Sequence, residues 1–291
     1  FQLRNWELVS INPNNKNWDW VDYFNFWAVS VQSVIGFSLV ASLYLLYDLN
    51  SIVVFSGCLS AAVLVYFFSN LIGKISQTSG LSFPVILRLS MGFNGARYVG
   101  MVRCLIGIFM FGVQTFFISK SIGYLIRIFI YQIDQQLINN EIFFLFFFGL
   151  NLIDLTSLIL TSLVQFYLFS KGQDSNRILI NFSSLFVYLG LIIFLIIIIS
   201  EHSNDLVNSI KLSTVTSNFL LKENILPFTS ITGTMFAYFS ILLLSYGDFS
   251  RSAKNIKEMK KGNLSLILNL IIFSIFSILI VLGSEIILTK N

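Results

Sequence analysis

Seven long apolar stretches divide this chain of 291 residues, and no other feature restricts its possible folds as strongly. A helix needs about 20 mainly apolar residues to cross the hydrocarbon core of a bilayer, which is about 30 Å thick. The stretches lie at about residues 23–47, 52–72, 99–130, 142–169, 178–200, 225–246 and 264–288. Backbone polar groups inside a bilayer must be paired within the protein, so we predict an all-α integral membrane protein with about seven transmembrane helices.

The composition supports this class and excludes soluble ones. Hydrophobic residues make up 56% of the chain and charged residues only 11%, whereas about a quarter of a soluble domain is charged. The net charge of +4 is explained by basic loops, so we expect no nucleic-acid partner. Cys58 and Cys104 lie in separate apolar stretches without a metal-binding or redox spacing. We therefore interpret both as packing residues and expect no cofactor.

Basic residues are concentrated in alternate loops. One set of loops holds twelve of them: Arg4, Lys16, Lys74, Arg88, Arg97, Lys171, Arg177, Arg251, Lys254, Lys257, Lys260 and Lys261. The opposite loops hold Lys211 and Lys222. Loops rich in Lys and Arg stay on the cytoplasmic side, so we predict a multi-pass protein of the cytoplasmic membrane with a cytoplasmic N-terminus. Residues 1–22 form the predicted N-terminal segment, in which we expect no signal peptide.

Polar residues inside the apolar stretches are the candidates for function. Gln114 lies eleven residues beyond Arg103, or about 16 Å along a helix, which places its carboxamide near the middle of the bilayer. There it either forms a hydrogen bond to another helix or binds a ligand. An aspartate such as Asp154 costs about 2.5 to 3.5 kcal/mol at a helix centre, so it should face protein or mark a bend near an interface. Residues 30–36 are unusually polar, and we predict that the first helix unwinds there.

The segment from Phe83 to Lys120 carries the most specific motif. It contains FPVILRLSMGFNGA, then Arg103, then MFGVQT. This motif resembles that of the nucleobase:cation symporter family of the first type, whose members carry purines, pyrimidines, hydantoins and allantoin. The family pattern reads roughly F-P-x-x-x-R-x-S-x-G-x-x-G-A, an arginine, and W-[FY]-G-x-Q-T. In the family, the tryptophan of that pattern stacks on the substrate ring. In this chain Met110 replaces it.

Two shorter segments also resemble the family. Gln165, Gly172 and Arg177 keep a family spacing between the fourth and fifth stretches. Residues 248–251, DFSR, match the family's D-F-[ST]-R. We interpret Asp248 and Arg251 as a pair that fixes a helix end at the cytoplasmic surface.

The resemblance implies a LeuT-like fold, which consists of two inverted repeats of five helices with a binding site near the midplane. The transmembrane region would span residues 23–291, with the first repeat at about 23–200 and the start of the second at about 225–291. About twelve helices are usual in the family, so we expect the chain to cover about the first seven and not to transport alone.

The resemblance also implies a function and a site. The expected activity is cation-coupled symport of a nucleobase or a related planar amide heterocycle, without covalent chemistry, so the protein would not be an enzyme. The implied substrate-binding residues are Gln114, Met110, Phe239 and Gln32. Backbone carbonyls near Val29 and Gln32 would hold sodium, and the coupling ion is sodium or a proton. The identity of the heterocycle and the oligomeric state stay open.

Two other classes fit parts of the sequence. A hydrophobic subunit of a respiratory or other multi-subunit complex has a similar composition, but it would carry lysines and glutamates through its helix centres. A membrane enzyme acting on lipids would need a cluster of His, Asp or Glu at a membrane surface. Asp248, Arg251 and Glu258 are too few for that chemistry.

Overall fold

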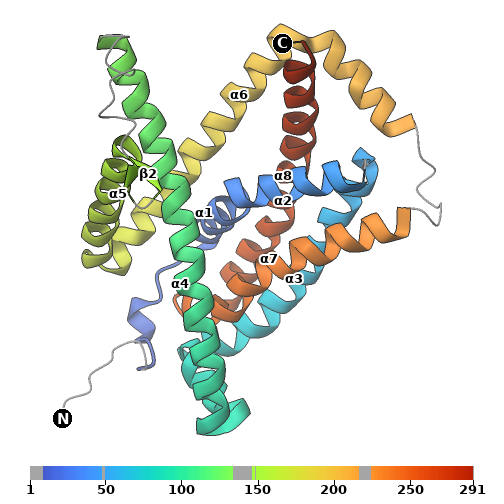
Figure 1. The fold of residues 1–291 in the computed structure, drawn as a ribbon. Helices are drawn as coiled ribbons and strands as arrows, with labels where there is room; N and C mark the ends of the chain where they lie inside the picture. The colour runs from blue at the N-terminus through green and yellow to red at the C-terminus, as the bar shows by residue number, and fades with distance from the viewer. Residues whose placement is uncertain (1–8, 48–49, 134–145, 148, 216–223, 291) are drawn as a thin grey trace. The chain divides into compact units, whose positions relative to one another are not determined.

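The computed structural model describes residues 9–47, 50–133, 146–147, 149–215 and 224–290, and these residues are almost entirely helical (Figure 1). The elements in chain order are a short 3-10 helix η2 (Pro13–Asn15), α1 (Trp20–Val31), α2 (Val34–Tyr47), α3 (Ser51–Ser79), α4 (Phe83–Ile133), β1 (Phe146–Phe147), β2 (Leu150–Asn151), α5 (Leu152–Ser170), α6 (Gln173–Val215), α7 (Ile225–Ser250) and α8 (Ile256–Lys290). Strands β1 and β2 form one small antiparallel pair.

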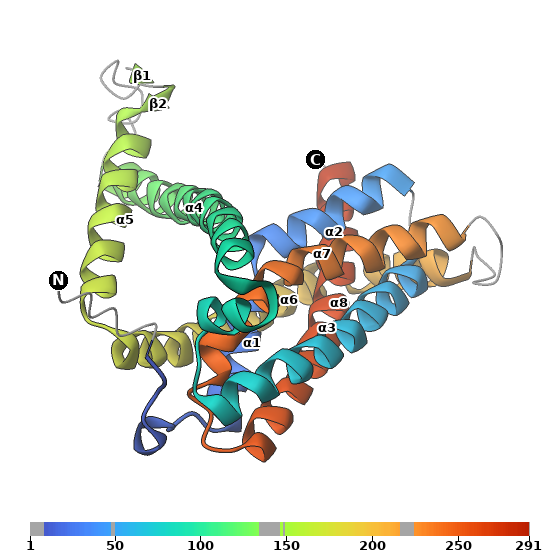
Figure 2. The same cartoon turned by 90° about the horizontal axis from the view of Figure 1, so that it is seen from below.

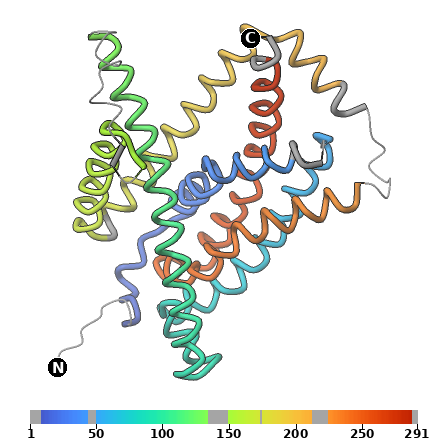
Figure 3. The backbone as a smooth tube through the Cα atoms, in the orientation of Figure 1, coloured from blue at the N-terminus to red at the C-terminus, as the bar shows by residue number. Residues whose placement is uncertain are grey.

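Among the described residues, six helices are long and apolar enough to cross a membrane. A seventh span results if α1 and α2 count as one helix bent by 49°. Figure 3 shows the chain changing direction between these two segments. The predictions of seven transmembrane helices and of unwinding within residues 30–36 are therefore both confirmed.

Three predicted helix limits are wrong. The basic segment before the third stretch is not a loop, because α4 already begins at Phe83 and includes Arg88 and Arg97. The segment Gly92-Phe93-Asn94-Gly95, whose sequence predicts a turn, is helical except at Gly92, whose φ of 69° interrupts the helix at a residue that tolerates a left-handed backbone. The predicted start of the fourth helix near residue 142 lies outside the described residues, but residues 146–147 and 150–151 form a strand pair and α5 begins at Leu152, where the side chain of Asn151 caps its first turn.

The chain forms two compact units, which are described separately. The first unit comprises residues 1–97 and 180–291. In it α3 packs against both α7 and α8, and α1 packs against α8 (Figures 1 and 2). Gly262 of α8 permits the closest approach, because a Cβ atom at that position would lie 2.3 Å from Tyr23 Cβ of α1.

The N-terminal segment is attached to the same unit. The Trp18 backbone N–H donates to Ser252 O at 3.0 Å, and Lys254 N–H donates back to Trp18 O at 2.9 Å. Asp19 then caps α1 by accepting from the backbone N–H groups of Val21 and Asp22. This pairing fixes the start of α1 next to the connection between α7 and α8.

The second unit, residues 98–179, contains most of α4 together with α5. Asp154 in the first turn of α5 binds two cations of α4, Lys120 Nζ at 2.6 Å and Arg127 Nη2 at 2.9 Å. The Asp154 side chain is 8% exposed. The prediction that this aspartate faces protein is confirmed, although its two partners were not foreseen.

Candidate substrate site

The break between α1 and α2 is the most unusual backbone feature of the first unit. Gln32 has φ −78° and ψ 65°, so the helix stops at Val31. Gln32 N–H still donates to Ala28 O at 2.9 Å, but Ser33 N–H donates to Val31 O at 2.8 Å. In a continuous helix Ser33 N–H would instead bind Val29 O. The break therefore gives the carbonyl of Val29 the character of a helix terminus, where backbone oxygens bind ligands or water.

Side chains from other helices hold this break in place. Ser33 Oγ accepts from Gly36 N–H at 3.1 Å, which caps the start of α2. The same Oγ lies 2.7 Å from the hydroxyl of Tyr238 in α7. Phe37 of α2 packs against Phe273 of α8, with ring centroids 4.7 Å apart. The unwound turn is thus a fixed structural element, built from contacts to both α7 and α8.

Gln32 is buried at the break with one half of its carboxamide engaged. Its Nε2 donates to the backbone carbonyl of Asn269 in α8 at 3.2 Å, and its side chain is only 5% exposed. Its Oε1 has no hydrogen-bond partner among the described residues. A buried acceptor without a partner costs about 1 to 3 kcal/mol, so such groups often mark functional positions. Gln32 therefore offers a fixed acceptor to a ligand with an N–H group.

Asn269 connects this region to a third helix. It is fully buried in α8, and its Oδ1 accepts a hydrogen bond from the hydroxyl of Tyr188 in α6. Its Nδ2 donates to Ser265 O at 2.9 Å. The sequence analysis missed Asn269, although a carboxamide inside the seventh apolar stretch was the available signal.

A second buried asparagine of α8 holds the middle of α1. Asn263 Oδ1 accepts from Trp27 Nε1 at 3.2 Å and also from the hydroxyl of Tyr246 in α7. Asn263 Nδ2 donates to Asn70 Oδ1 of α3 at 3.0 Å. The Trp27 and Tyr246 rings stack at 5.5 Å. One side chain thus joins four helices, α1, α3, α7 and α8.

The four predicted substrate residues lie in different units. Gln32 and Phe239 belong to the first unit, and Met110 and Gln114 belong to the second. Phe239 is fully buried in the helix core, where it contacts Tyr238 at a ring distance of 5.1 Å. Within the second unit Met110 is partly exposed and Gln114 is exposed. Phe239 thus packs in the core of the first unit. The side chains of Met110 and Gln114 in α4 are accessible within the second unit.

Two other residues singled out in the sequence have structural contacts. Gln165 Oε1 accepts from the hydroxyl of Thr115 at 3.1 Å, which joins α5 to α4 next to Gln114. Asp248 Oδ1 accepts from the backbone N–H of Phe83 at 2.9 Å. This hydrogen bond ties the end of α7 to the start of α4, whereas the pairing of Asp248 with Arg251 stays a prediction.

A bundle of membrane helices whose first helix is broken at a buried polar side chain is typical of secondary transporters. The model of the family described as permeases for cytosine/purines, uracil, thiamine and allantoin matches residues 10–291. The chain belongs to this family, and the predicted family is confirmed. Its members are transporters rather than enzymes, which also confirms the predicted class of protein.

Three relatives illustrate the similarity. A putative allantoin permease from Escherichia coli (strain K12) is 25% identical over 298 residues, which cover 98% of this chain and 58% of the relative. An allantoin permease from Bacillus subtilis (strain 168) is 26% identical over 125 residues, or 43% of this chain and 25% of the relative. A purine-uracil permease from Arabidopsis thaliana is 24% identical over 271 residues, or 91% of this chain and 42% of the relative. The chain thus spans 25 to 58% of the length of these relatives. No solved structure shows significant similarity to it.

Proposed function

We propose that the protein takes part in transport of a nucleobase or a related planar heterocycle across the cytoplasmic membrane, coupled to sodium or protons. The observation that carries this proposal is the unpartnered Oε1 of Gln32 at the break between α1 and α2. Nucleobases, hydantoins and allantoin all carry ring N–H groups that can donate to such an acceptor. The names of the related permeases agree with this substrate class.

The remaining substrate contacts are proposed from the family motif. Gln114 would pair with the amide edge of the ring, since a carboxamide offers one acceptor and two donor hydrogens. Met110 would contact the ring face through its polarizable sulfur, in place of the tryptophan found in the family. Phe239 would contact the substrate ring as a second wall, and it is the aromatic one. Because Phe239 is fully buried, this role requires the core around it to open when substrate binds.

The same break supplies backbone oxygen ligands for a coupling cation. The last carbonyls of α1, near Val29 and Gln32, lie at the negative end of the helix dipole. Hard cations prefer oxygen ligands, and a helix break places several backbone oxygens close together. These carbonyls are our proposed contribution of α1 to a sodium site.

We further propose that the N-terminus is cytoplasmic, on the basis of the basic loops. Lys120 and Arg127 lie in the C-terminal half of α4, so the proposed topology puts both on the opposite side of this count. Asp154 pairs with both cations and reduces their net contribution. The asymmetry therefore keeps its direction.

The transport proposal is tested by uptake of radiolabelled allantoin, uracil, cytosine and hydantoin into cells that lack their own carriers, with and without sodium. Gln32→Leu should raise the KM for the accepted substrate about five- to 150-fold, which corresponds to the loss of one buried hydrogen bond. Gln77→Leu is the matched control. Gln77 is 7% exposed, and its Nε2 also donates to a backbone carbonyl of another segment, Ala253 O at 3.3 Å.

Equal stability losses in the two variants, with a raised KM in Gln32→Leu alone, would support the proposal. An unchanged KM in Gln32→Leu would show that Gln32 serves only packing. Absence of uptake for every heterocycle by the parent protein would refute the proposed function.

A further inference from the structure

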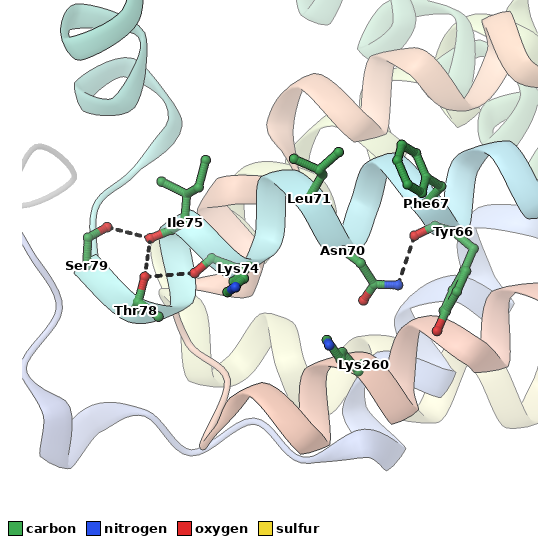
Figure 4. A pocket seen from close by; sticks show the side chains of 9 residues that line it. All are labelled: Tyr66, Phe67, Asn70, Leu71, Lys74, Ile75, Thr78, Ser79 and Lys260. Atoms are coloured by element: carbon green, nitrogen blue, oxygen red, sulfur yellow. Dashed lines mark hydrogen bonds between the residues drawn. The ribbon is translucent and has the colours of Figure 1, made fainter.

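A groove of about 670 Å³ lies on the surface of the first unit, along α3 and beside the start of α8 (Figure 4). One wall is an apolar stripe made by Phe67, Leu71 and Ile75, which recur every four residues on one face of α3. These side chains are 59%, 51% and 49% exposed. The stripe runs parallel to the axis of a helix that is long and apolar enough to cross a membrane.

Two lysines line the same groove beside this stripe. Lys74 comes from α3, and Lys260 extends from α8 toward α3. Both follow residues at the contact between α3 and α8, since a Cβ atom at Gly73 would lie 2.8 Å from Met259 Sδ. Within the described part of the chain, neither ammonium group forms an ion pair.

Two of the three hydroxyl groups that line the groove, those of Thr78 and Ser79, are already used, whereas the third belongs to Tyr66. Thr78 Oγ1 donates to Lys74 O at 2.8 Å, and Ser79 Oγ donates to Ile75 O at 2.7 Å. The two ammonium groups are therefore the charged donors that the groove offers to a ligand, and the Tyr66 hydroxyl is a neutral one. Their charge requires an anion, and the apolar stripe beside them requires a hydrocarbon chain.

We propose that this groove binds one anionic phospholipid. The phosphate lies between Lys74 and Lys260, and an acyl chain follows Phe67, Leu71 and Ile75 along α3. A soluble phosphate satisfies the two lysines but leaves the exposed stripe uncovered, so the lipid matches both parts of the groove. Clusters of basic residues at helix ends bind anionic headgroups for the same electrostatic reason.

The test measures binding of individual lipids to the purified protein in detergent by native mass spectrometry. Phosphatidylglycerol is compared with phosphatidylcholine of identical acyl chains. The double variant Lys74→Gln/Lys260→Gln should lose about 30-fold in affinity for phosphatidylglycerol, or about fivefold per lysine, with little change for phosphatidylcholine. Leu71→Asn should weaken both lipids equally, because it alters only chain contacts.

The matched control is Lys257→Gln/Lys261→Gln, which removes the same charge from the same end of α8 but does not alter the groove lining. It should change phosphatidylglycerol affinity less than threefold, which is below the effect of one lysine. Thermal unfolding in the same detergent verifies that each variant is folded. Equal weakening by both double variants, or no weakening by the groove variant, would overturn the proposal. Competition by glycerol 3-phosphate at the concentration of the lipid would also overturn it, since that molecule has the headgroup phosphate and no acyl chains.

Discussion

Replacing Asn263 with leucine should destabilise the helix bundle more than any other single loss of a polar group in the first unit. The substitution keeps the number and branching of the side-chain heavy atoms and removes three hydrogen bonds, to Trp27, Tyr246 and Asn70. Trp27 and Tyr246 are fully buried, so water cannot replace the lost partner. The indole N–H and the phenol O–H would be left without an acceptor.

The expected loss of unfolding free energy depends on whether it is counted as lost hydrogen bonds or as buried groups left unpaired. Hydrogen bonds between membrane helices contribute about 0.6 kcal/mol each on average, which gives about 2 kcal/mol for three. A buried group left unpaired costs about 1 to 3 kcal/mol, which places the upper figure near 6 kcal/mol. We therefore expect Asn263→Leu to lose at least about 2 kcal/mol of unfolding free energy. Tyr246→Phe should lose only about 0.6 kcal/mol, because Asn263 Oδ1 keeps its bond to Trp27.

The assay is equilibrium unfolding of the purified protein by SDS in mixed micelles, followed by far-UV circular dichroism. The double variant Asn263→Leu/Tyr246→Phe tests the network directly. In the Asn263→Leu background the Tyr246 hydroxyl is an unpaired buried group, so its removal should be neutral or stabilising. Additive losses, or a loss below about 0.5 kcal/mol for Asn263→Leu, would refute the reasoning.

Three further predictions concern other parts of the chain. Gln114→Leu should raise the KM for the transported heterocycle about five- to 150-fold without lowering stability, as measured by uptake and SDS unfolding; an unchanged KM would assign Gln114 to helix packing. Asp154→Asn should cost about 1 to 3 kcal/mol in SDS unfolding, because it breaks two largely buried ion pairs. The control Asp19→Asn keeps the helix cap and loses only an exposed pair at 3.8 Å, so it should be nearly neutral. In a Cys104→Ser background, Ser203→Cys should react with an impermeant thiol reagent added outside the cell; reaction from the cytoplasmic side alone would reverse the proposed orientation.

The sequence predicted those features of the fold whose signals are local. The length of each apolar stretch sets the number of spans, and the polar run around Gln32 marks the break, because both depend on neighbouring residues alone. The start of α5 was wrong because the apolar residues near 142–147 resemble a helix in composition. Only the cap by Asn151 limits the helix there.

The polar contacts between helices were not predictable in the same way. Whether Asn263 and Asn269 face protein or lipid depends on the rotation of α8 against its neighbours, which no local pattern encodes. Their partners Trp27 and Tyr188 lie 236 and 81 residues away in sequence. The charge cluster in the second unit was also missed, because Asp154 lies 34 and 27 residues from Lys120 and Arg127 in sequence and only helix packing brings them together.

The geometry at the break explains why a carboxamide suits position 32 better than a carboxylate. The partner of Gln32 Nε2 is the carbonyl of Asn269, which can only accept a hydrogen bond. The amide must therefore turn its Nε2 toward Asn269 O. In the opposite orientation Gln32 Oε1 would face Asn269 O, and both atoms are acceptors. This fixed orientation is what leaves Oε1 as the half available to a ligand. A glutamate would lose the donor and add a buried charge beside a carbonyl oxygen, so it would release the side chain from α8 as well as change its chemistry. The same contact that stabilises the break thus selects which half of the glutamine a substrate N–H would meet.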